Sequence, residues 1–171
     1  PNGVLFGANA QVDVGALVAS TARQANQGLD GSWTFSDKGT GQVINQGHIK
    51  AKDGGFVVLD SAAQALNSGT IQANMGGVAL TVAQNTRIAL DAQGQLNVNV
   101  DGAVLQALVS NQGLILADGG AVHLTARGKN MLLSSVVNQT GVIKARSVQN
   151  RNGRIFLSGG RSEERRVGKE C

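Results

Sequence analysis

Apolar and polar residues alternate with a period of two in many short segments, and Gly, Asn or Asp separates one segment from the next. In residues 49–52, Ile49 and Ala51 point to one face of an extended chain, while Lys50 and Lys52 point to the other. This period is typical of β-strands with one buried face. The alternation therefore predicts many short strands whose apolar side chains share an interior.

Two templates of this kind recur in a fixed order. Asn-x-Gly-x-Ile-x-Ala begins at Asn45, Asn67 and Asn111, and a copy with one inserted residue begins at Asn138. Gly-x-Val/Ile-x-Leu follows each copy, and its glycines are Gly55, Gly76, Gly120 and Gly153. The first two asparagines are 22 residues apart and the next two 44, which is two periods. We therefore expect one further turn between them, built from residues 88–90 and 96–100.

Repeated strands bury their apolar faces by stacking on one another. We predict an all-β fold, a right-handed parallel β-helix with coils of about 22 residues. Stacking places Ile49, Ile71, Ile115 and Ile143 in one interior column and Leu59, Leu80, Leu124 and Leu157 in another. At one corner we expect a ladder of amides that bond between coils, formed by Asn45, Asn67, Asn111 and Asn138. A meander β-sandwich is the alternative, but it would not predict two templates in a fixed order.

Composition favours strands and sets the last residues apart. Residues 1–160 hold 14 Asn, 14 Gln and no Glu, a bias toward turns and against helices. Residues 161–171 hold three Glu and the one Cys, and their back-translation resembles the start of a sequencing-library adapter. We expect the native domain to be 1–160 and the tail 161–171 to be non-native, the alternative being a genuine charged extension. Without the tail the net charge is +3 and a thiol site is excluded.

Few residues carry chemistry. A β-helix carbohydrate-active enzyme, one alternative, needs carboxylates on neighbouring coils, but Asp53 and Asp118 precede Gly-Gly and are interpreted as turn residues. His48 and His123 occur singly and are expected at surface strand positions. Trp33, which alternates with Phe35, is expected in a short strand or hairpin laid over the solenoid. We therefore expect no catalytic residue, no cofactor, no metal and no small-molecule substrate.

A polyanion-binding solenoid is a further alternative. Lys50, Lys52, Lys144 and Arg146 alternate outward on their strands. They lie on non-adjacent coils, and the aromatic residues that stack on single-stranded nucleic acid are missing. We interpret them as solvated surface residues and expect no nucleic-acid partner.

The chain opens with Pro1-Asn2-Gly3-Val4-Leu5-Phe6-Gly7, and Ala10-Gln11-Val12-Asp13-Val14-Gly15-Ala16-Leu17-Val18-Ala19-Ser20-Thr21 follows. This opening resembles the secretion domain of the filamentous-haemagglutinin family, the exoproteins of two-partner secretion, whose pattern runs NPNGI, LFG, AQV and GGLVAST. The first Asn of NPNGI is missing, Val4 replaces Ile, and Ala16 replaces the second Gly of GGLVAST. We therefore expect a fragment whose signal and N-terminal cap lie upstream.

The resemblance implies a non-enzymatic secretion and recognition module at the start of a large surface exoprotein of the adhesin type. A cognate outer-membrane β-barrel transporter would recognise it in the periplasm, and the chain would then fold outside the cell or on its surface. Pro1, Asn2, Gly3 and Val4 would form the transporter-recognition turn. The resemblance also allows a host or neighbouring-cell surface as a partner. Adhesion, haem acquisition, cytolysis and toxin delivery depend on the downstream region.

Overall fold

The structure is a computed structural model that describes residues 3–92, 94–128, 135–151 and 154–165. For residues 135–136, 146–151 and 154–165 it describes the backbone alone. All the elements of this part of the chain are β-strands, and none of it forms a helix long and apolar enough to cross a bilayer.

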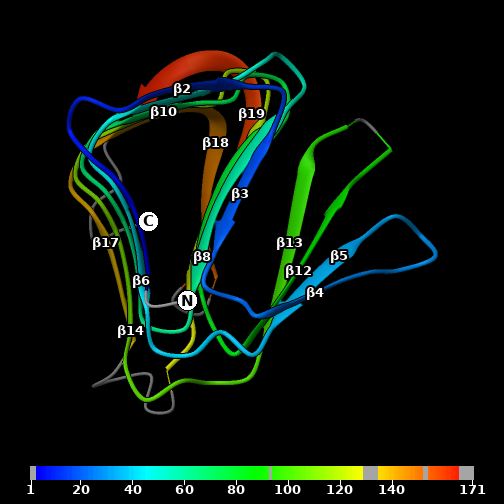
Figure 1. The fold of residues 1–171 in the computed structure, drawn as a ribbon. Helices are drawn as coiled ribbons and strands as arrows, with labels where there is room; N and C mark the ends of the chain where they lie inside the picture. Colours follow the sequence, from blue (N-terminus) through cyan, green and yellow to red (C-terminus); the bar gives the residue numbers. More distant parts are fainter. Residues whose placement is uncertain (1–2, 93, 129–134, 152–153, 166–171) are drawn as a thin grey trace.

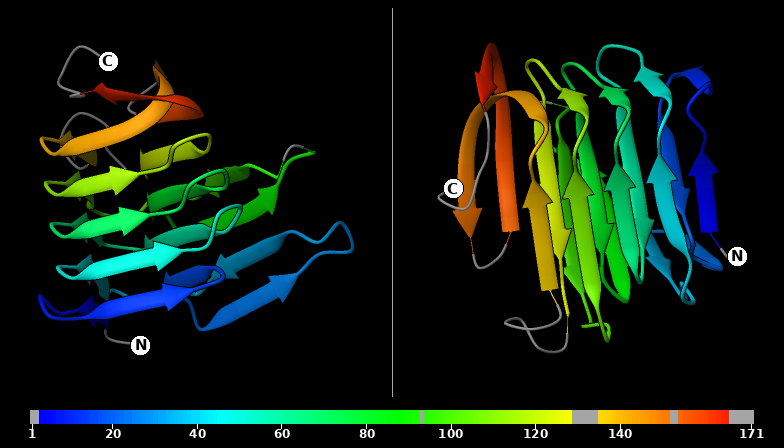
Figure 2. Two further views of the ribbon diagram at one scale, coloured as in Figure 1. Left: turned by 90° about the horizontal axis from the view of Figure 1, so that it is seen from above. Right: turned by 90° about the vertical axis from the view of Figure 1, so that its left-hand side faces the viewer.

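Fifteen of the described strands wind into five successive coils, which are superposed in Figure 1 and separated in Figure 2. The first coil consists of β1 (Gly3–Phe6), β2 (Gln11–Val14) and β3 (Leu17–Ser20). The second consists of β6 (Gln42–Asn45), β7 (His48–Ala51) and β8 (Phe56–Ser61), and the third of β9 (Gln64–Asn67), β10 (Thr70–Gln72) and β11 (Gly77–Val82). The fourth consists of β14 (Ala107–Asn111), β15 (Leu114–Leu116) and β16 (Ala121–Ala126), and the fifth of β17 (Ser135–Gln139), β18 (Val142–Arg151) and β19 (Arg154–Arg165).

Equivalent strands of successive coils pair in parallel, except that β19 runs antiparallel to β16 and β18. One sheet has the order β1-β6-β9-β14-β17. The other two faces belong to a ten-stranded sheet in which β2, β7, β10, β15 and β18 stack on one side and β3, β8, β11 and β16 on the other, with β19 between β18 and β16. The fold is thus the predicted right-handed parallel β-helix.

The interior columns follow the register of these sheets. Val12, Ile49, Ile71, Ile115 and Ile143 are paired in succession. Each of the four isoleucines is fully buried, which stabilises the fold by about 1.5–3 kcal/mol per side chain. Ala19, Leu59, Leu80 and Leu124 form the second column. Leu157 does not extend it, because β19 runs antiparallel to β16 and pairs Leu157 with Val122.

The prediction of an extra turn within residues 85–101 is wrong. These residues form a hairpin, β12 (Asn85–Leu90) and β13 (Leu96–Asp101), while Asn67 and Asn111 pair directly as members of adjacent coils. A second hairpin, β4 (Gln24–Gln27) and β5 (Trp33–Ser36), leaves between the first and second coils. Together they form one four-stranded sheet in the order β13-β12-β5-β4, called the antiparallel sheet below. The 22-residue spacing therefore holds only where no hairpin is inserted.

The antiparallel sheet covers the outer surface of the solenoid over β8 and β11 (Figure 1). A second apolar cluster fills the space between them and consists of Phe35, Val58, Ala79, Ile88, Leu96 and Val98. Strands β8 and β11 are consequently covered on both faces, and nearly all of their residues are buried. Trp33 and Phe35 lie on β5, in the hairpin expected over the solenoid, with Phe35 packed in this cluster and Trp33 39% exposed.

The tail is partly described. Strand β19 continues to Arg165 and pairs Glu163 and Glu164 with Ala145 and Lys144. Residues 166–171 lie outside the described part of the chain. The non-native origin of the tail stays a prediction.

Candidate functional site

The expected recognition turn lies at the start of the first coil. Pro1 and Asn2 fall outside the described residues, and Gly3 is the first residue of β1. Gly3 has φ +144°, and a Cβ there would lie 2.9 Å from the carbonyl oxygen of Gln42 on β6. Val4 is half-buried and packs against the main core. Gly3 and Val4 thus lie in β1, where they pair with Gln42 and Val43 of the second coil.

Within the described residues, each strand of the first coil lies at the end of its sheet. β1 ends the five-stranded sheet, and β2 and β3 are the two end strands of the ten-stranded sheet. The carbonyls of Ala10, directly before β2, and of Val14 on β2 accept hydrogen bonds from His48 and Lys52 of the next coil. Because backbone groups alternate between the two sides of a strand, Gln11 and Asp13 direct theirs to the other, free side, which no described strand covers.

An amide ladder runs through one corner of the solenoid. Asn45 donates from Nδ2 to Oδ1 of Asn67 at 2.9 Å, and Asn67 donates in the same way to Asn111 at 2.8 Å. Asn111 then donates to Oε1 of Gln139 at 2.8 Å. All four are buried, and each amide that is removed would leave its neighbour unpaired.

Asn138 is not part of this ladder, contrary to our expectation. It is exposed and pairs with Ser110, while Gln139 pairs with Asn111. The corner glycine sets the position, since the ladder residue lies two residues before Gly47, and Gln139 lies two residues before Gly141. The inserted residue after Asn138 therefore shifts Gln139 into the ladder.

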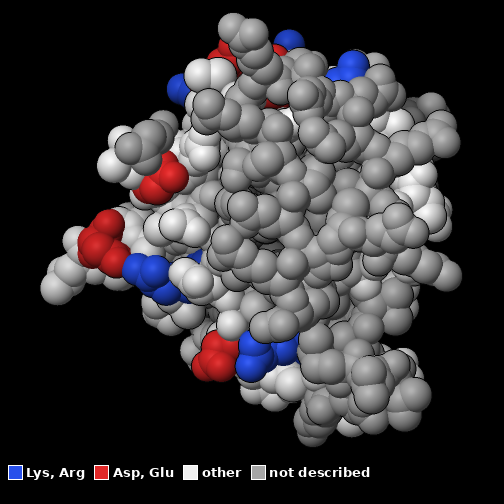
Figure 3. Space-filling view, turned by 180° about the vertical axis from the view of Figure 1, so that it is seen from behind, with Lys and Arg blue, Asp and Glu red and all other residues white. Residues whose placement is uncertain are grey.

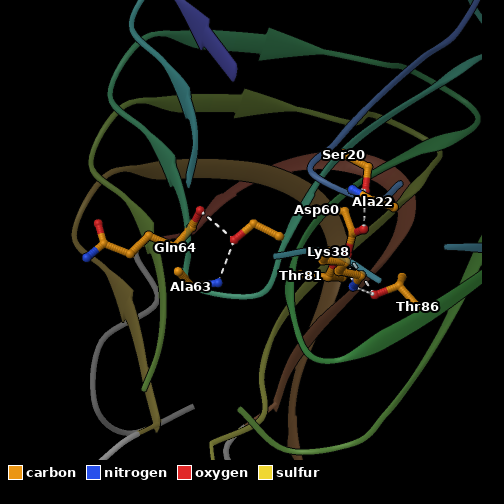
Figure 4. Close-up of polar contacts among 9 residues, drawn as sticks. Ser20, Ala22, Lys38, Asp60, Ala63, Gln64, Thr81 and Thr86 are labelled. Carbon is orange, nitrogen blue, oxygen red and sulfur yellow. Dashed lines mark hydrogen bonds and ion pairs between the residues drawn. The ribbon is translucent and has the colours of Figure 1, made fainter. Parts of the chain in front are cut away.

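A buried polar cluster lies where the antiparallel sheet leaves the solenoid (Figure 4). Its members, which we call the Asp60 cluster, are Ser20 of β3, Lys38 after β5, Asp60 of β8, Thr81 of β11 and Thr86 of β12. Oδ1 of Asp60 accepts from Lys38 Nζ at 2.6 Å, Thr81 Oγ1 at 2.8 Å and Thr86 Oγ1 at 2.7 Å. Oδ2 accepts from Ser20 Oγ at 2.6 Å, and Lys38 also donates to Thr86 at 2.6 Å.

This cluster is closed to solvent. The side chains of Lys38 and Asp60 are both fully buried. Burial lowers the pKa of Lys38 below its ordinary 10.5, and the charge of Asp60 opposes that change only in part. Four donors surround the carboxylate, so its charge is fully hydrogen-bonded. Such an arrangement fixes geometry, and nothing in it leaves an acid or base free to react.

Sequence reasoning missed this cluster. Its one local signal is a polar residue directly after the leucine of the second template, as in Leu59-Asp60 and Leu80-Thr81. These side chains point outward, where the pattern predicts solvent. The burial of Asp60 and Thr81 depends on the docked antiparallel sheet, which contributes Thr86 and holds Lys38 beside Asp60.

His123 is also covered by this sheet. We expected it at a surface position, but it is fully buried, and its Nε2 lies 3.0 Å from the carbonyl oxygen of Leu96 on β13. His48 is exposed as expected.

Asp30 and Arg87 form an ion pair between the turn of the β4–β5 hairpin and β12. The Ser32 hydroxyl and backbone N–H, and then the Arg87 guanidinium, lower the pKa of Asp30 from 3.8 to about 2. A carboxylate with a depressed pKa stabilises the folded state above its unfolded pKa, and the contribution is lost as pH falls toward the folded value.

We expect Asp30→Asn to remove this pH dependence. The stability difference between wild type and variant should be constant above pH 4 and should shrink between pH 3.8 and about pH 2. Urea unfolding at pH 5, 3 and 2 measures it. A difference that grew as pH fell would contradict the assignment.

The described side chains offer little for catalysis or polyanion binding. Within residues 3–128 and 137–145, no group of three His, Cys, Asp or Glu side chains could hold a metal ion. Arg23 pairs with Asp37 and Arg87 pairs with Asp30, and on the face in Figure 3 several basic side chains lie next to acidic ones. Mixed charge of this kind does not favour a polyanion.

Comparison with known proteins decides the family. The family model described as the TPS secretion domain matches residues 1–169. The chain belongs to the TPS secretion domain family. This TPS domain is therefore a secretion module of the two-partner system, and its β-helix is the fold of that family.

Two curated relatives of the TPS domain are heme/hemopexin-binding proteins of Haemophilus influenzae. One, from strain Rd, is 37% identical over 169 residues, which cover 92% of this chain and 18% of the relative. The other is 31% identical over 183 residues, covering 92% of this chain and 19% of the relative. The TPS domain thus spans less than a fifth of these relatives, whose names describe binding by the whole proteins.

Proposed function

We propose that the TPS domain opens a large surface exoprotein of the adhesin type and is recognised in the periplasm at its first coil by the periplasmic domains of a cognate outer-membrane transporter. The observation that carries this proposal is the match of residues 1–169 to the TPS secretion domain. An extended segment of the transporter would add a strand beside β2 through main-chain hydrogen bonds. The recognition turn at Pro1, Asn2, Gly3 and Val4 would set the register of that strand.

The proposed route ends outside the cell. A solenoid can nucleate at one end and add coils in turn, and each added coil buries further apolar side chains. Folding beyond the membrane would then bias export without ATP. Host or neighbouring-cell surfaces would be partners of the downstream region.

We also propose that the domain has no enzymatic activity and that residues 161–171 are not native to it. Asp60 is locked in its cluster and Asp30 is paired with Arg87, which supports the first point. Release of reducing ends from polysaccharides would contradict it, and genomic sequence that reads through residues 161–171 would contradict the second.

Export of the full-length exoprotein tests the free edge. Asp13→Pro removes a backbone N–H that faces the free side of β2, a position where an edge strand tolerates proline. We expect secretion to fall roughly tenfold. Asp13→Ala keeps the N–H and should be secreted normally.

The purified domain carrying Asp13→Pro must have the same melting temperature as wild type, so that a loss of export can be assigned to lost recognition by the transporter. Normal export of this variant would exclude strand addition at β2.

Exchanging Asn2 and Gly3 tests the recognition turn in the same assay. Unchanged export of that variant would remove the role of the turn.

A further inference from the structure

The Asp60 cluster joins segments that are far apart in the sequence. The hydrogen bonds from Asp60 span 40 residues to Ser20, 22 to Lys38, 21 to Thr81 and 26 to Thr86. The Asp60 carboxylate, in the second coil, thus contacts both neighbouring coils through Ser20 and Thr81. It also contacts Lys38, which follows the β4–β5 hairpin, and Thr86 of the β12–β13 hairpin. Contacts between neighbouring coils are usual in a solenoid, whereas the two links to the antiparallel sheet are additional.

The cluster is incomplete until the third coil and the β12–β13 hairpin are in place. With only residues 3–61 folded, Asp60 would lack Thr81 and Thr86, and Lys38 would lack Thr86. The full set of hydrogen bonds to the carboxylate therefore forms only when all of these segments are docked together. Because hydrogen bonds to a charged group are directional, they form only when the antiparallel sheet docks in one position on the solenoid. Apolar packing in the cluster under the sheet is non-directional and does not by itself fix that position.

We infer that the Asp60 cluster is a latch that makes the first three coils and the antiparallel sheet fold and open as one cooperative unit. This unit extends from β1 to β13, and the later coils add to it singly. If the proposed export route holds, the first folding step outside the membrane involves about 100 residues rather than one coil of about 22.

Native-state hydrogen exchange of the purified full chain, followed by mass spectrometry, tests the latch. In wild type, peptides from β5, β8, β11 and β12 should open with one common free energy, as expected of a cooperative unit. Thr86→Val keeps the shape of the side chain and removes its hydroxyl. We expect peptides of β4, β5, β12 and β13 then to exchange at least about tenfold faster than those of β8 and β11.

Thr86→Ser is the matched control because it keeps the hydroxyl, and its peptides should exchange together as in wild type. Asp30→Asn is the second control, since it removes an exposed ion pair between the same two hairpins. It should leave the common opening intact. Trp33, the single tryptophan, lies on β5 and gives an independent fluorescence signal for the antiparallel sheet.

Three results would overturn the inference. The first is that wild-type peptides of the antiparallel sheet open separately from those of β8. The second is that Thr86→Val leaves the exchange rates unchanged, and the third is that it speeds exchange equally in the antiparallel sheet and in the solenoid. The last result would show that apolar packing couples them. A folded Lys38→Met/Asp60→Leu variant, which removes both charges, must separate the two regions as well. Because no transporter is present, failure here leaves the export proposal untouched, and failure of export leaves this result untouched.

Discussion

Replacing Lys38 with methionine should lower the free energy of unfolding by about 3–5 kcal/mol. The change leaves the Asp60 carboxylate buried without its cation, although Ser20, Thr81 and Thr86 still donate to it. Removing one partner of a fully buried ion pair lowers the free energy of unfolding by more than the intact pair contributes to it. Urea unfolding of the purified domain, followed by circular dichroism at neutral pH, measures the loss.

The matched control is the double variant Lys38→Met/Asp60→Leu, which removes both charges and keeps apolar volume. It should recover most of the lost stability, because no buried charge remains unpaired. A double variant as unstable as Lys38→Met alone would show that the loss arises from packing. A single variant within about 0.5 kcal/mol of wild type would contradict the buried geometry.

Gly69→Ala should destabilise the solenoid by more than about 3 kcal/mol or prevent folding. A Cβ at this position would lie 2.0 Å from the carbonyl oxygen of Gly47 and 2.7 Å from the carbonyl carbon of Gln46. Both are backbone atoms of the coil below, so no side chain can move aside. Thermal and urea unfolding measure the effect.

Gly7→Ala is the control for this prediction. A Cβ at Gly7 would meet nothing within 4 Å, and its φ is not in the left-handed region. It should be neutral or stabilise the fold by about 0.4–1 kcal/mol through the unfolded state. Equal losses in both variants would show that backbone flexibility, and not contact between stacked corners, is the cause.

The corner contact is repeated along the solenoid. A Cβ at Gly113 would lie 2.0 Å from the carbonyl oxygen of Gly69, and one at Gly141 would lie 2.1 Å from that of Gly113. The Asn-x-Gly template thus combines two requirements of one corner. The glycine permits close stacking, and the residue two positions earlier bridges the coils through its amide.

The local pattern was sufficient for the solenoid itself. Alternation places Ile49, Ile71 and Ile115 on the buried side of their strands whatever the rest of the chain does, because side chains alternate along any strand. A fixed order of templates then stacks them. The same logic gave three of the four residues of the amide ladder, and the opening motif indicated the family.

The local pattern could not distinguish an inserted hairpin from a coil. Residues 85–101 alternate as any strand does, so the spacing of 44 between Asn67 and Asn111 was interpreted as two turns. Asn138 was assigned to the ladder because the template begins with Asn, although the distance to the corner glycine selects Gln139. Local residue identity was a weaker guide there than position relative to the corner.

By itself the sequence determined which segments are strands, which face of each is interior and that the coils stack. Only the tertiary structure decided which outward faces are also buried. His123, Asp60 and Thr81 point away from the solenoid axis, and the sequence places such residues in solvent. They are buried because the antiparallel sheet docks over β8 and β11, through contacts between residues that lie 20 or more positions apart. Strand alternation is a property of neighbouring residues, whereas the docking of one sheet on another is not.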